Sequence, residues 1–282
     1  MRPSPIAKVS VITTGRGSGH HEHVYGTKKP TLWWIFFGKR RVTLPINVYA
    51  NEHPDGLVLF DTGVDTRVVT DPDYWPDPVT ALFMRNIFEW DIEPSDRLGR
   101  QLELAGYSAS DVSKAVISHL HADHVGGLGD IPQADLYVAG EAWEHMLGPH
   151  PEREMVMRRD IVVLGAKWNP IEFTPTTDPL LSRFGGVFDL MGDESMVVVP
   201  TPGHQDGSVS MLVRRANGPP LLLVGDLTYA EELLDRDQVP GTGNPALLRQ
   251  SFAQVRALKE QMPDLIILPG HDPLAPDKLQ VA

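Results

Sequence analysis

The sequence predicts an α/β fold in which helices cover the outer faces of β-sheets. Short apolar runs typical of strands alternate with segments of helical periodicity along the 282 residues. Several runs hold three or four apolar residues in succession, as strands buried on both faces do. The 25 glycines and 25 prolines are spread along the chain and do not mark a linker. These observations predict one compact domain over residues 1–282.

Strands are expected at nine apolar runs, each bounded by turn-forming residues. In chain order they are Val9–Thr14, Ile46–Ala50, Leu57–Phe60, Ala115–Ser118, Leu136–Ala139, Met196–Val199, Val209–Val213, Leu221–Val224 and Leu265–Leu268. Five of these runs lead directly into a segment that carries histidine or aspartate.

Three helices are expected between the strands. Ser95 or Asp96 can cap the first, which then ends at Gly106. The pair Asn244-Pro245 can start the second, because proline is favoured in a first helical turn. A third helix is expected from 140 to about 158. The apolar stripes of the first two helices are Leu98, Leu102 and Ala105, and Leu248, Phe252 and Val255.

Composition excludes several classes of protein. With 25 Lys and Arg against 37 Asp and Glu, the net charge is −12, which argues against a nucleic-acid or anionic-membrane partner. The absence of cysteine excludes disulfides, thiolate zinc sites and a cysteine nucleophile. No signal peptide is recognisable, and the apolar run Leu32–Phe37 is too short to span a bilayer. A cytoplasmic protein without a membrane partner is therefore expected.

Potential metal ligands or acids follow five of the predicted strands. The segments are Asp61-Thr62-Gly63, His119–His124, Thr201-Pro202-Gly203-His204, Gly225-Asp226 and Gly270-His271. A single aspartate after a strand is often only a turn residue. In α/β folds, however, ligands bind beyond the carboxyl ends of strands, so five such segments are expected to converge on one site.

The strongest local pattern is His-x-His-x-Asp-His over residues 119–124. Composition alone would produce this pattern in on the order of one chain in a thousand of this length, so it is a specific metal-binding hypothesis. The small residues Ala122, Gly126 and Gly127 let the backbone turn there.

Seven donors in all are available: His119, His121, Asp123, His124, His204, Asp226 and His271. One zinc ion rarely takes more than four protein ligands. Seven donors therefore fit two divalent ions that share Asp226 and a hydroxide, an arrangement typical of hydrolases. Zinc is the first expectation, and the nitrogen and oxygen donors would also accept iron, cobalt or manganese.

In these segments and their order, the sequence resembles the metallo-β-lactamase superfamily. The resemblance implies its αβ/βα four-layer sandwich. It also implies that Asp226 bridges the two ions and that Asp61 orients a ligand histidine. The first ion would be held by His119, His121 and His204, and the second by Asp123, His124 and His271. Lactamases of this superfamily that use a cysteine ligand are poor models, because the chain has none.

A closer resemblance is to the N-acyl homoserine lactonases of the superfamily, which are quorum-quenching enzymes. It lies in Leu44–Tyr49, in the run from Asp226 to Tyr229, and in Glu231–Asp237 with the Val-Pro pair that follows. The Gly-His repeat common in these lactonases is broken after His204. The resemblance implies that a metal-bridging hydroxide attacks a lactone carbonyl. Tyr229 would stabilise the carbonyl oxygen, and Asp123 would pass a proton to the leaving alkoxide.

Two stretches, 30–41 and 71–94, are rich in aromatic residues and are interpreted as insertions. One interpretation is an apolar channel for the acyl chain of a small lactone substrate, with Trp33, Phe83, Met84 and Phe88 as its walls. The alternatives are a local core or the contact of a homodimer. The run His20–His23 is interpreted as a polar loop near the mouth of the site.

Two other functions remain open at this stage. The same metal motif would serve a hydrolase of thioesters, phosphotriesters or aryl esters. A di-iron protein that reduces dioxygen or nitric oxide would use similar ligands, but it usually requires a flavin partner domain for which the chain has no additional sequence.

Overall fold

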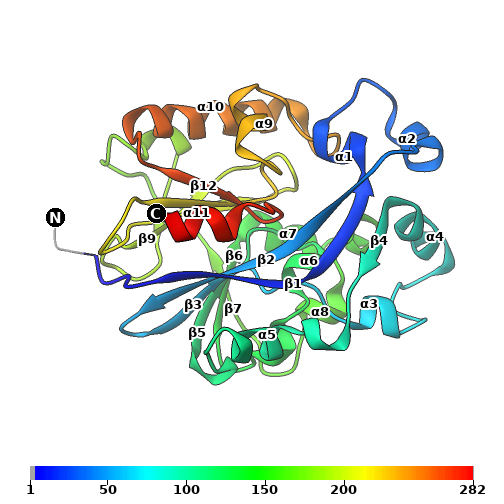
Figure 1. The fold of residues 1–282 in the computed structure, drawn as a ribbon, viewed down its shortest axis with the longest axis horizontal. Coiled ribbons are helices and arrows are strands. Elements are labelled where there is room, and N and C mark those ends of the chain that lie inside the picture. Colours follow the sequence, from blue (N-terminus) through cyan, green and yellow to red (C-terminus); the bar gives the residue numbers. More distant parts are fainter. Residues whose placement is uncertain (1–3, 282) are drawn as a thin grey trace.

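Two β-sheets pack face to face in the computed structural model, which describes residues 4–281 (Figure 1). The larger sheet contains β1 (Val9–His20), β2 (Arg41–His53), β3 (Gly56–Phe60), β4 (Phe88–Asp91), β5 (Val112–Val116), β6 (Asp135–Ala139) and β7 (Lys167–Ile171). The smaller contains β8 (Phe188–Asp189), β9 (Met196–Pro200), β10 (Val209–Val213), β11 (Leu221–Gly225) and β12 (Ile266–Pro269). Each predicted strand overlaps one of these, while β4, β7 and β8 were not predicted.

Helices connect the strands and cover the sheets. They are α1 (His21–Tyr25), α2 (Thr31–Phe37), α3 (Arg67–Thr70), α4 (Pro78–Ile87), α5 (Leu98–Leu104), α6 (Ala122–Val125), α7 (Gly140–Leu147), α8 (Arg158–Ile161), α9 (Glu231–Asp235), α10 (Pro245–Gln261) and α11 (Ala275–Val281). Short 3₁₀ turns lie at Pro94–Asp96, Ala109–Asp111, Leu128–Asp130, Pro151–Glu154 and Ser182–Phe184. Within residues 4–281, no helix is long and apolar enough to cross a membrane.

The helix predictions were right for α10 and partly wrong for the other two. The Asn244 side chain caps α10 by accepting from the backbone of the second and third residues after it. The cap expected for α5 is displaced, because Asp96 instead accepts from the backbone of Glu93 and closes the preceding 3₁₀ turn. The helix expected over 140–158 ends at Leu147, because His150 is left-handed with φ 57° and a proline follows it.

The buried apolar side chains form layers. One cluster lies between the two sheets and joins β2, β3 and β5 to β9, β10, β11 and β12. A second lies under α5 and α7 on the outer face of the larger sheet. A third lies under α10 on the outer face of the smaller sheet. The order helix, sheet, sheet, helix confirms the predicted αβ/βα four-layer sandwich.

Strand direction brings the functional segments to one edge of this sandwich. Strands β3 and β5 run parallel in the larger sheet, as β11 and β12 do in the smaller. Strand β9 has the same direction as β11, because both are antiparallel to β10. The carboxyl ends of all five strands therefore lie at the edge where the sheets meet.

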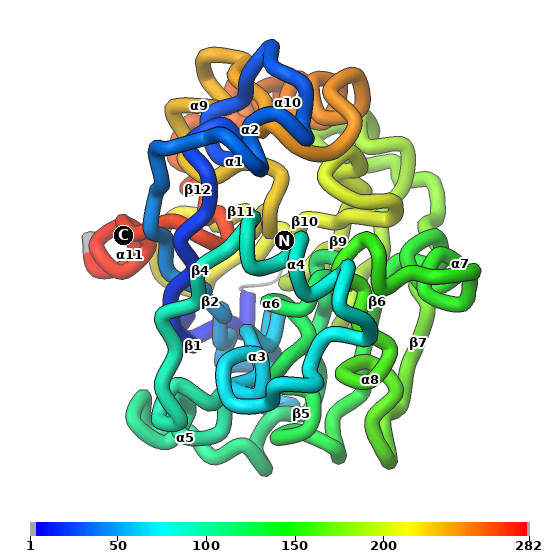
Figure 2. Tube along the Cα trace, turned by 90° about the vertical axis from the view of Figure 1, so that its right-hand side faces the viewer, coloured from blue at the N-terminus to red at the C-terminus, as the bar shows by residue number. Residues whose placement is uncertain are grey.

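The two aromatic-rich stretches form ordered elements over this edge. Residues 30–41 contain α2, and residues 71–94 contain α4 and β4, which pairs with β1. Helices α2 and α4 contact each other. Figures 1 and 2 both place α1 and α2 beside α9, although about 200 residues separate these segments in the chain.

Gly126, which follows α6, is expected to tolerate no side chain. A Cβ there would lie 2.0 Å from the Asp65 backbone nitrogen and 2.3 Å from the Val64 carbonyl carbon. We expect Gly126→Ala to lower the free energy of unfolding by about 1–3 kcal/mol, measured by urea denaturation. The control is Gly129→Ala, because a Cβ at Gly129 meets nothing within 4 Å. Equal stability of the two variants would contradict this expectation.

Candidate active site

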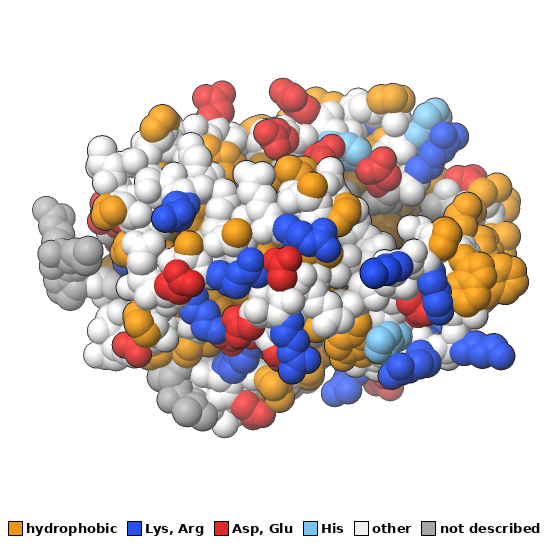
Figure 3. Space-filling view, turned by 90° about the horizontal axis from the view of Figure 1, so that it is seen from above, with side chains coloured by type: hydrophobic (Ala, Val, Ile, Leu, Met, Phe, Trp, Pro, Cys, Tyr) orange, Lys and Arg blue, Asp and Glu red, His pale blue; other side chains and the backbone are white. Residues whose placement is uncertain are grey.

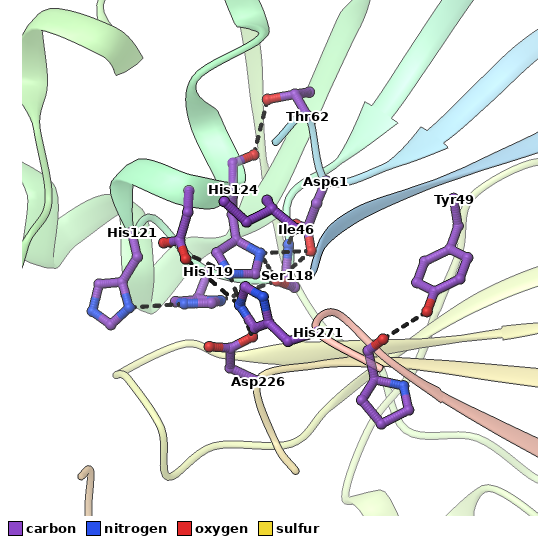
Figure 4. A network of polar contacts seen from close by, with 12 residues as sticks. Ile46, Tyr49, Asp61, Thr62, Ser118, His119, His121, His124, Asp226 and His271 are labelled. Carbon is purple, nitrogen blue, oxygen red and sulfur yellow. Dashed lines mark hydrogen bonds and ion pairs between the residues drawn. The ribbon is translucent and has the colours of Figure 1, made fainter. Parts of the chain in front are cut away.

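The structure brings all seven predicted donors together beyond the carboxyl ends of β5, β9, β11 and β12. The short turn before α6 and the helix itself carry the His119–His124 segment, and Figure 4 shows the rings of His119 and His124 close to Asp226 and His271 of the smaller sheet. His204, Asp226 and His271 come from the smaller sheet, after β9, β11 and β12. All seven side chains are buried except His121, which is half-buried.

Three imidazoles form one group of candidate ligands. His119 Nε2 lies 2.9 Å from His121 Nδ1, which lies 3.1 Å from His204 Nε2. Each residue offers a nitrogen within 4.8 Å of the others. Three imidazole nitrogens that face a common point are a typical set of ligands for a zinc-type ion.

A second group contains Asp123, His124 and His271, whose ligand atoms also lie within 4.8 Å of one another. Asp226 lies between the two groups. Its Oδ1 is 3.1 Å from His271 Nε2 and 3.4 Å from His124 Nε2, and its Oδ2 is 3.5 Å from His204 Nε2. One carboxylate therefore contacts histidines of both groups.

Hydrogen bonds at the far side of two rings indicate that a cation fits here. His124 Nδ1 donates to Asp61, and His271 Nδ1 donates to the Pro45 carbonyl oxygen. In the neutral rings, both Nε2 lone pairs therefore face the Asp226 carboxylate. His124 Nε2 and Asp226 Oδ1 are buried without a hydrogen-bond partner. Two electron-rich atoms this close require a positive charge between them, which a metal ion or a proton can supply.

The charges in the site also favour a bound cation. Although burial opposes it, Asp61 and Asp226 raise the pKa of His124 well above its ordinary value. Conversely, burial and the neighbouring histidines lower the pKa of His119 well below its ordinary value. Nitrogen lone pairs next to carboxylates are a donor set that suits divalent ions.

Asp61 holds one of these rings in place from behind. Its Oδ2 is 2.9 Å from His124 Nδ1, and its two oxygens accept from the backbone N–H and the hydroxyl of Ser118 at 2.7 and 2.8 Å. The residue itself has a φ of 64°, in the left-handed region that aspartate tolerates better than most side chains. These contacts hold the His124 ring from the side away from Asp226.

We expect Asp61→Asn to weaken metal retention about 10- to 100-fold while leaving the protein folded. The asparagine side chain has one acceptor oxygen where aspartate has two, so it cannot accept from both His124 and the Ser118 backbone. It also lacks the negative charge that orients His124. The measurement is metal content after dialysis against graded chelator concentrations. The control is Asp55→Asn, whose exposed carboxylate lies near His53 at the turn between β2 and β3. Identical metal retention in the two variants would contradict this expectation.

An apolar cavity of about 440 Å³ opens onto the donor groups. His121, Asp123, His204, Asp226 and His271 lie at its polar end. Its walls come from β1, β2, α2, α4 and β4, and include Trp34, Ile35, Val42, Leu44, Ile46, Met84, Ile87, Phe88 and Trp90. A cavity of this size with a few convergent polar groups is typical of a small-molecule site.

Tyr229 also faces this cavity. It is buried, and its hydroxyl donates to Asp226 Oδ2 at 3.2 Å. Burial and the nearby carboxylates raise the pKa of Tyr229 well above its ordinary value, so the phenol keeps its proton. A neutral hydroxyl beside the donor groups can donate a hydrogen bond to an oxygen bound there.

The walls differ in part from those expected. Met84 and Phe88 line the cavity, but Trp33 and Phe83 do not. Trp33 is 45% exposed and faces a separate surface groove, whereas the next residue, Trp34, is 1% exposed and lines the cavity. Phe83 packs edge-on against Phe36 outside it. The residues of α2 that face the cavity, Trp34 and Ile35, follow the predicted Trp33 by one and two positions.

The sequence interpretation missed His23. The run His20–His23 is not a loop: it covers the end of β1 and the start of α1. His23 is buried, lines the cavity, and lies 2.7 Å from the Tyr229 hydroxyl through its Nε2. A short run of histidines carries no signal for this contact, because its partner Tyr229 lies 206 positions away in the sequence.

Comparison with known proteins gives the family. The model of the Metallo-beta-lactamase superfamily matches residues 41–271. The chain belongs to this superfamily. Members of the metallo-β-lactamase superfamily similar to it include the N-acyl homoserine lactonase AttM of Rhizobium radiobacter, 28% identical over 82% of each chain. A probable metallo-hydrolase of Mycobacterium tuberculosis is 32% identical over 82% of this chain and 76% of its own.

Solved structures share the fold of this superfamily member. An N-acyl homoserine lactone hydrolase with N-hexanoyl-L-homoserine bound at its catalytic metal centre superposes with a TM-score of 0.76. The two chains are 22% identical, and the match covers 98% of this chain and 96% of the other. Family membership and the His and Asp groups together indicate that this protein uses a divalent metal.

Proposed function

We propose that the protein is a dinuclear metal-dependent lactonase that opens the ring of N-acyl homoserine lactones. The observation that carries this proposal is the joint placement of two donor groups, a shared carboxylate and a tyrosine hydroxyl at the polar end of an apolar cavity. Relatives named as N-acyl homoserine lactonases support the substrate class.

The two ions, with zinc as the first expectation, would be held as the resemblance implies. His119, His121 and His204 would hold one, while Asp123, His124 and His271 would hold the other, with Asp226 shared. When bound, such ions lower the pKa of water toward neutrality and polarise a carbonyl oxygen.

The chain's own groups then direct the reaction. The Tyr229 hydroxyl donates to the lactone carbonyl oxygen, on which negative charge develops during attack. Asp123 lines the cavity and only 8% of it is exposed. It would take the proton of the attacking hydroxide and pass it to the ring oxygen as that oxygen leaves. No covalent intermediate with the protein is required.

The acyl chain occupies the apolar part of the cavity. Trp34, Ile35, Val42, Met84 and Phe88 line this part. A neutral, partly apolar substrate fits these walls better than a charged one, because no unpaired charge would be left against them.

A substrate panel tests this function. The metal-loaded protein is assayed by pH-stat with homoserine lactones of increasing acyl length, and with a thioester, an aryl ester and a phosphotriester. We expect the highest kcat/KM for an acyl homoserine lactone, with acid released and no chromogenic group needed. A preference for any other ester class over every lactone would overturn the proposal in favour of that hydrolase.

Truncation of the cavity wall is expected to change acyl-chain preference. Met84→Ala should lower kcat/KM for long-chain lactones about 10-fold, and for short-chain lactones much less, because a longer acyl chain covers more of the apolar wall to which Met84 contributes. Trp33→Ala is the matched control, since Trp33 lies outside the cavity. The channel assignment fails if both variants keep the wild-type dependence on chain length.

We also propose a homodimer. Leu32, Phe36 and Phe37 on the outer side of α2 are 60%, 44% and 64% exposed, and Figure 3 shows apolar side chains gathered at this end of the molecule. Such exposed apolar patches often mark protein contacts. Sedimentation velocity of the wild type and of Phe37→Glu tests the proposal, which requires a dimer that the substitution dissociates.

A further inference from the structure

His23 is a buried histidine that the proposed reaction does not yet use. It lies on α1, and only 7% of it is exposed. Its ring packs edge-on against Phe88 at 5.3 Å between ring centroids, and it is tilted against the ring of Tyr229 at the same distance. A polar ring enclosed in this way must have partners for its nitrogens, because an unsatisfied buried nitrogen is costly.

Two hydroxyls flank the His23 ring. Its Nε2 lies 2.7 Å from the Tyr229 hydroxyl, and its Nδ1 lies 3.4 Å from Thr242 Oγ1. Burial lowers the pKa of His23 to about 4, so the ring is neutral near pH 7 and carries one proton. The ring must therefore donate to one hydroxyl and accept from the other.

The neighbouring carboxylate decides between the two tautomers. If Nε2 accepted the Tyr229 proton, the phenol oxygen would present only lone pairs to Asp226 Oδ2, which is 3.2 Å away. If Nε2 donates, the Tyr229 proton remains directed at Asp226 and Thr242 donates to Nδ1. In this second arrangement, every donor faces an acceptor and the hydrogen bonds run in one direction, so each strengthens the next.

We propose that His23 is a positioning residue for Tyr229: its Nε2–H donates to the phenol oxygen and keeps the hydroxyl proton directed at the donor groups. This inference rests on the proposed function, in which that proton meets the lactone carbonyl oxygen. Without His23, the hydroxyl would be free to rotate away, and its oxygen would lose the donor that makes the phenol a stronger acid.

The backbone around α1 holds His23 at this distance. Its carbonyl oxygen accepts from Gly241 N at 2.9 Å. A Cβ on Gly241 would lie 2.1 Å from the Glu22 carbonyl oxygen, so only glycine lets the two segments approach this closely. Because the contact joins residues 206 positions apart, it is a built feature of the fold and not a consequence of local sequence.

The tautomer is directly measurable. Long-range ¹H–¹⁵N spectra of the zinc-loaded protein, labelled with ¹⁵N-histidine, report which ring nitrogen of each histidine carries the proton. The His23 signals are assigned from their loss in His23→Gln. We expect a neutral ring protonated on Nε2. A ring protonated on Nδ1 would overturn the proposal, whatever the protein hydrolyses.

Kinetics of variants test the consequence. His23→Leu removes the donor and should lower kcat about 10-fold with little change in KM, whereas His23→Gln restores an N–H near the Nε2 position and should recover most of this loss. In the Tyr229→Phe background, His23→Leu should cause no further loss of kcat. His21→Leu is the matched control, because His21 lies on the same helix with its ring against Tyr25.

The outcomes separate this proposal from the proposed function. Absence of lactone hydrolysis by the wild type would refute the function, while the NMR result would still decide the orientation of Tyr229. Equal kcat losses for His23→Leu in the wild-type and Tyr229→Phe backgrounds would refute the positioning role and leave the lactonase assignment intact.

Discussion

Asp226→Ala is expected to abolish both metal binding and hydrolysis. Among residues 4–281, Asp226 is the one carboxylate that contacts histidines of both donor groups, through Oδ1 to His124 and His271 and through Oδ2 to His204. Its removal leaves these rings without the negative charge between them. We expect kcat/KM to fall by about 10³-fold or more, as is typical when one member of a catalytic unit is deleted.

Elemental analysis after dialysis and lactone turnover measure the two losses. Asp264→Ala is the matched control, because Asp264 is exposed and precedes β12 at the end away from the site. Circular dichroism of both variants verifies folding. An Asp226→Ala protein that kept two equivalents of metal and wild-type turnover would show that Asp226 is not the shared ligand.

The convergence of the donors was predictable because the direction of a strand determines at which edge of the sheet the segment after it lies. Each of the five segments follows an apolar run, and parallel strands of one sheet necessarily end at one edge. The sequence alone therefore indicated that residues as distant as Asp61 and His271 meet. The apolar runs by themselves predicted only strands that are covered on both faces. The αβ/βα four-layer arrangement was predicted from the resemblance to the superfamily.

Features set by packing between distant segments were not predictable. The hydrogen bond of His23 with Tyr229 depends on how α1 lies against the segment after α9, which no local pattern encodes. The choice between Trp33 and Trp34 as a cavity wall depends on the rotation of α2, which packs against α4 and, through Trp34, against His20 of β1. The end of α7 depends on a left-handed residue before Pro151, which overrides helical periodicity.

Tyr229→Phe is expected to lower kcat about 100-fold while leaving both metals bound. The substitution removes a single hydroxyl that contacts Asp226 and His23 but is not itself among the donor groups. Removal of one donor to a developing oxyanion typically costs about 10²–10³ in kcat. The phenyl ring keeps its stacking on His271, so the geometry of the cavity should persist.

The kinetic pattern distinguishes this role from simple packing. If the hydroxyl acts mainly in the transition state, kcat falls and KM changes little. Loss of a packing contact would instead lower stability or weaken binding of every substrate equally. Tyr107→Phe is the matched control, because the Tyr107 hydroxyl forms hydrogen bonds with Ser10 and Glu52, away from the donor groups. A Tyr229→Phe enzyme with wild-type kcat on its best lactone would remove both the oxyanion role of Tyr229 and the functional reason for His23 to orient it.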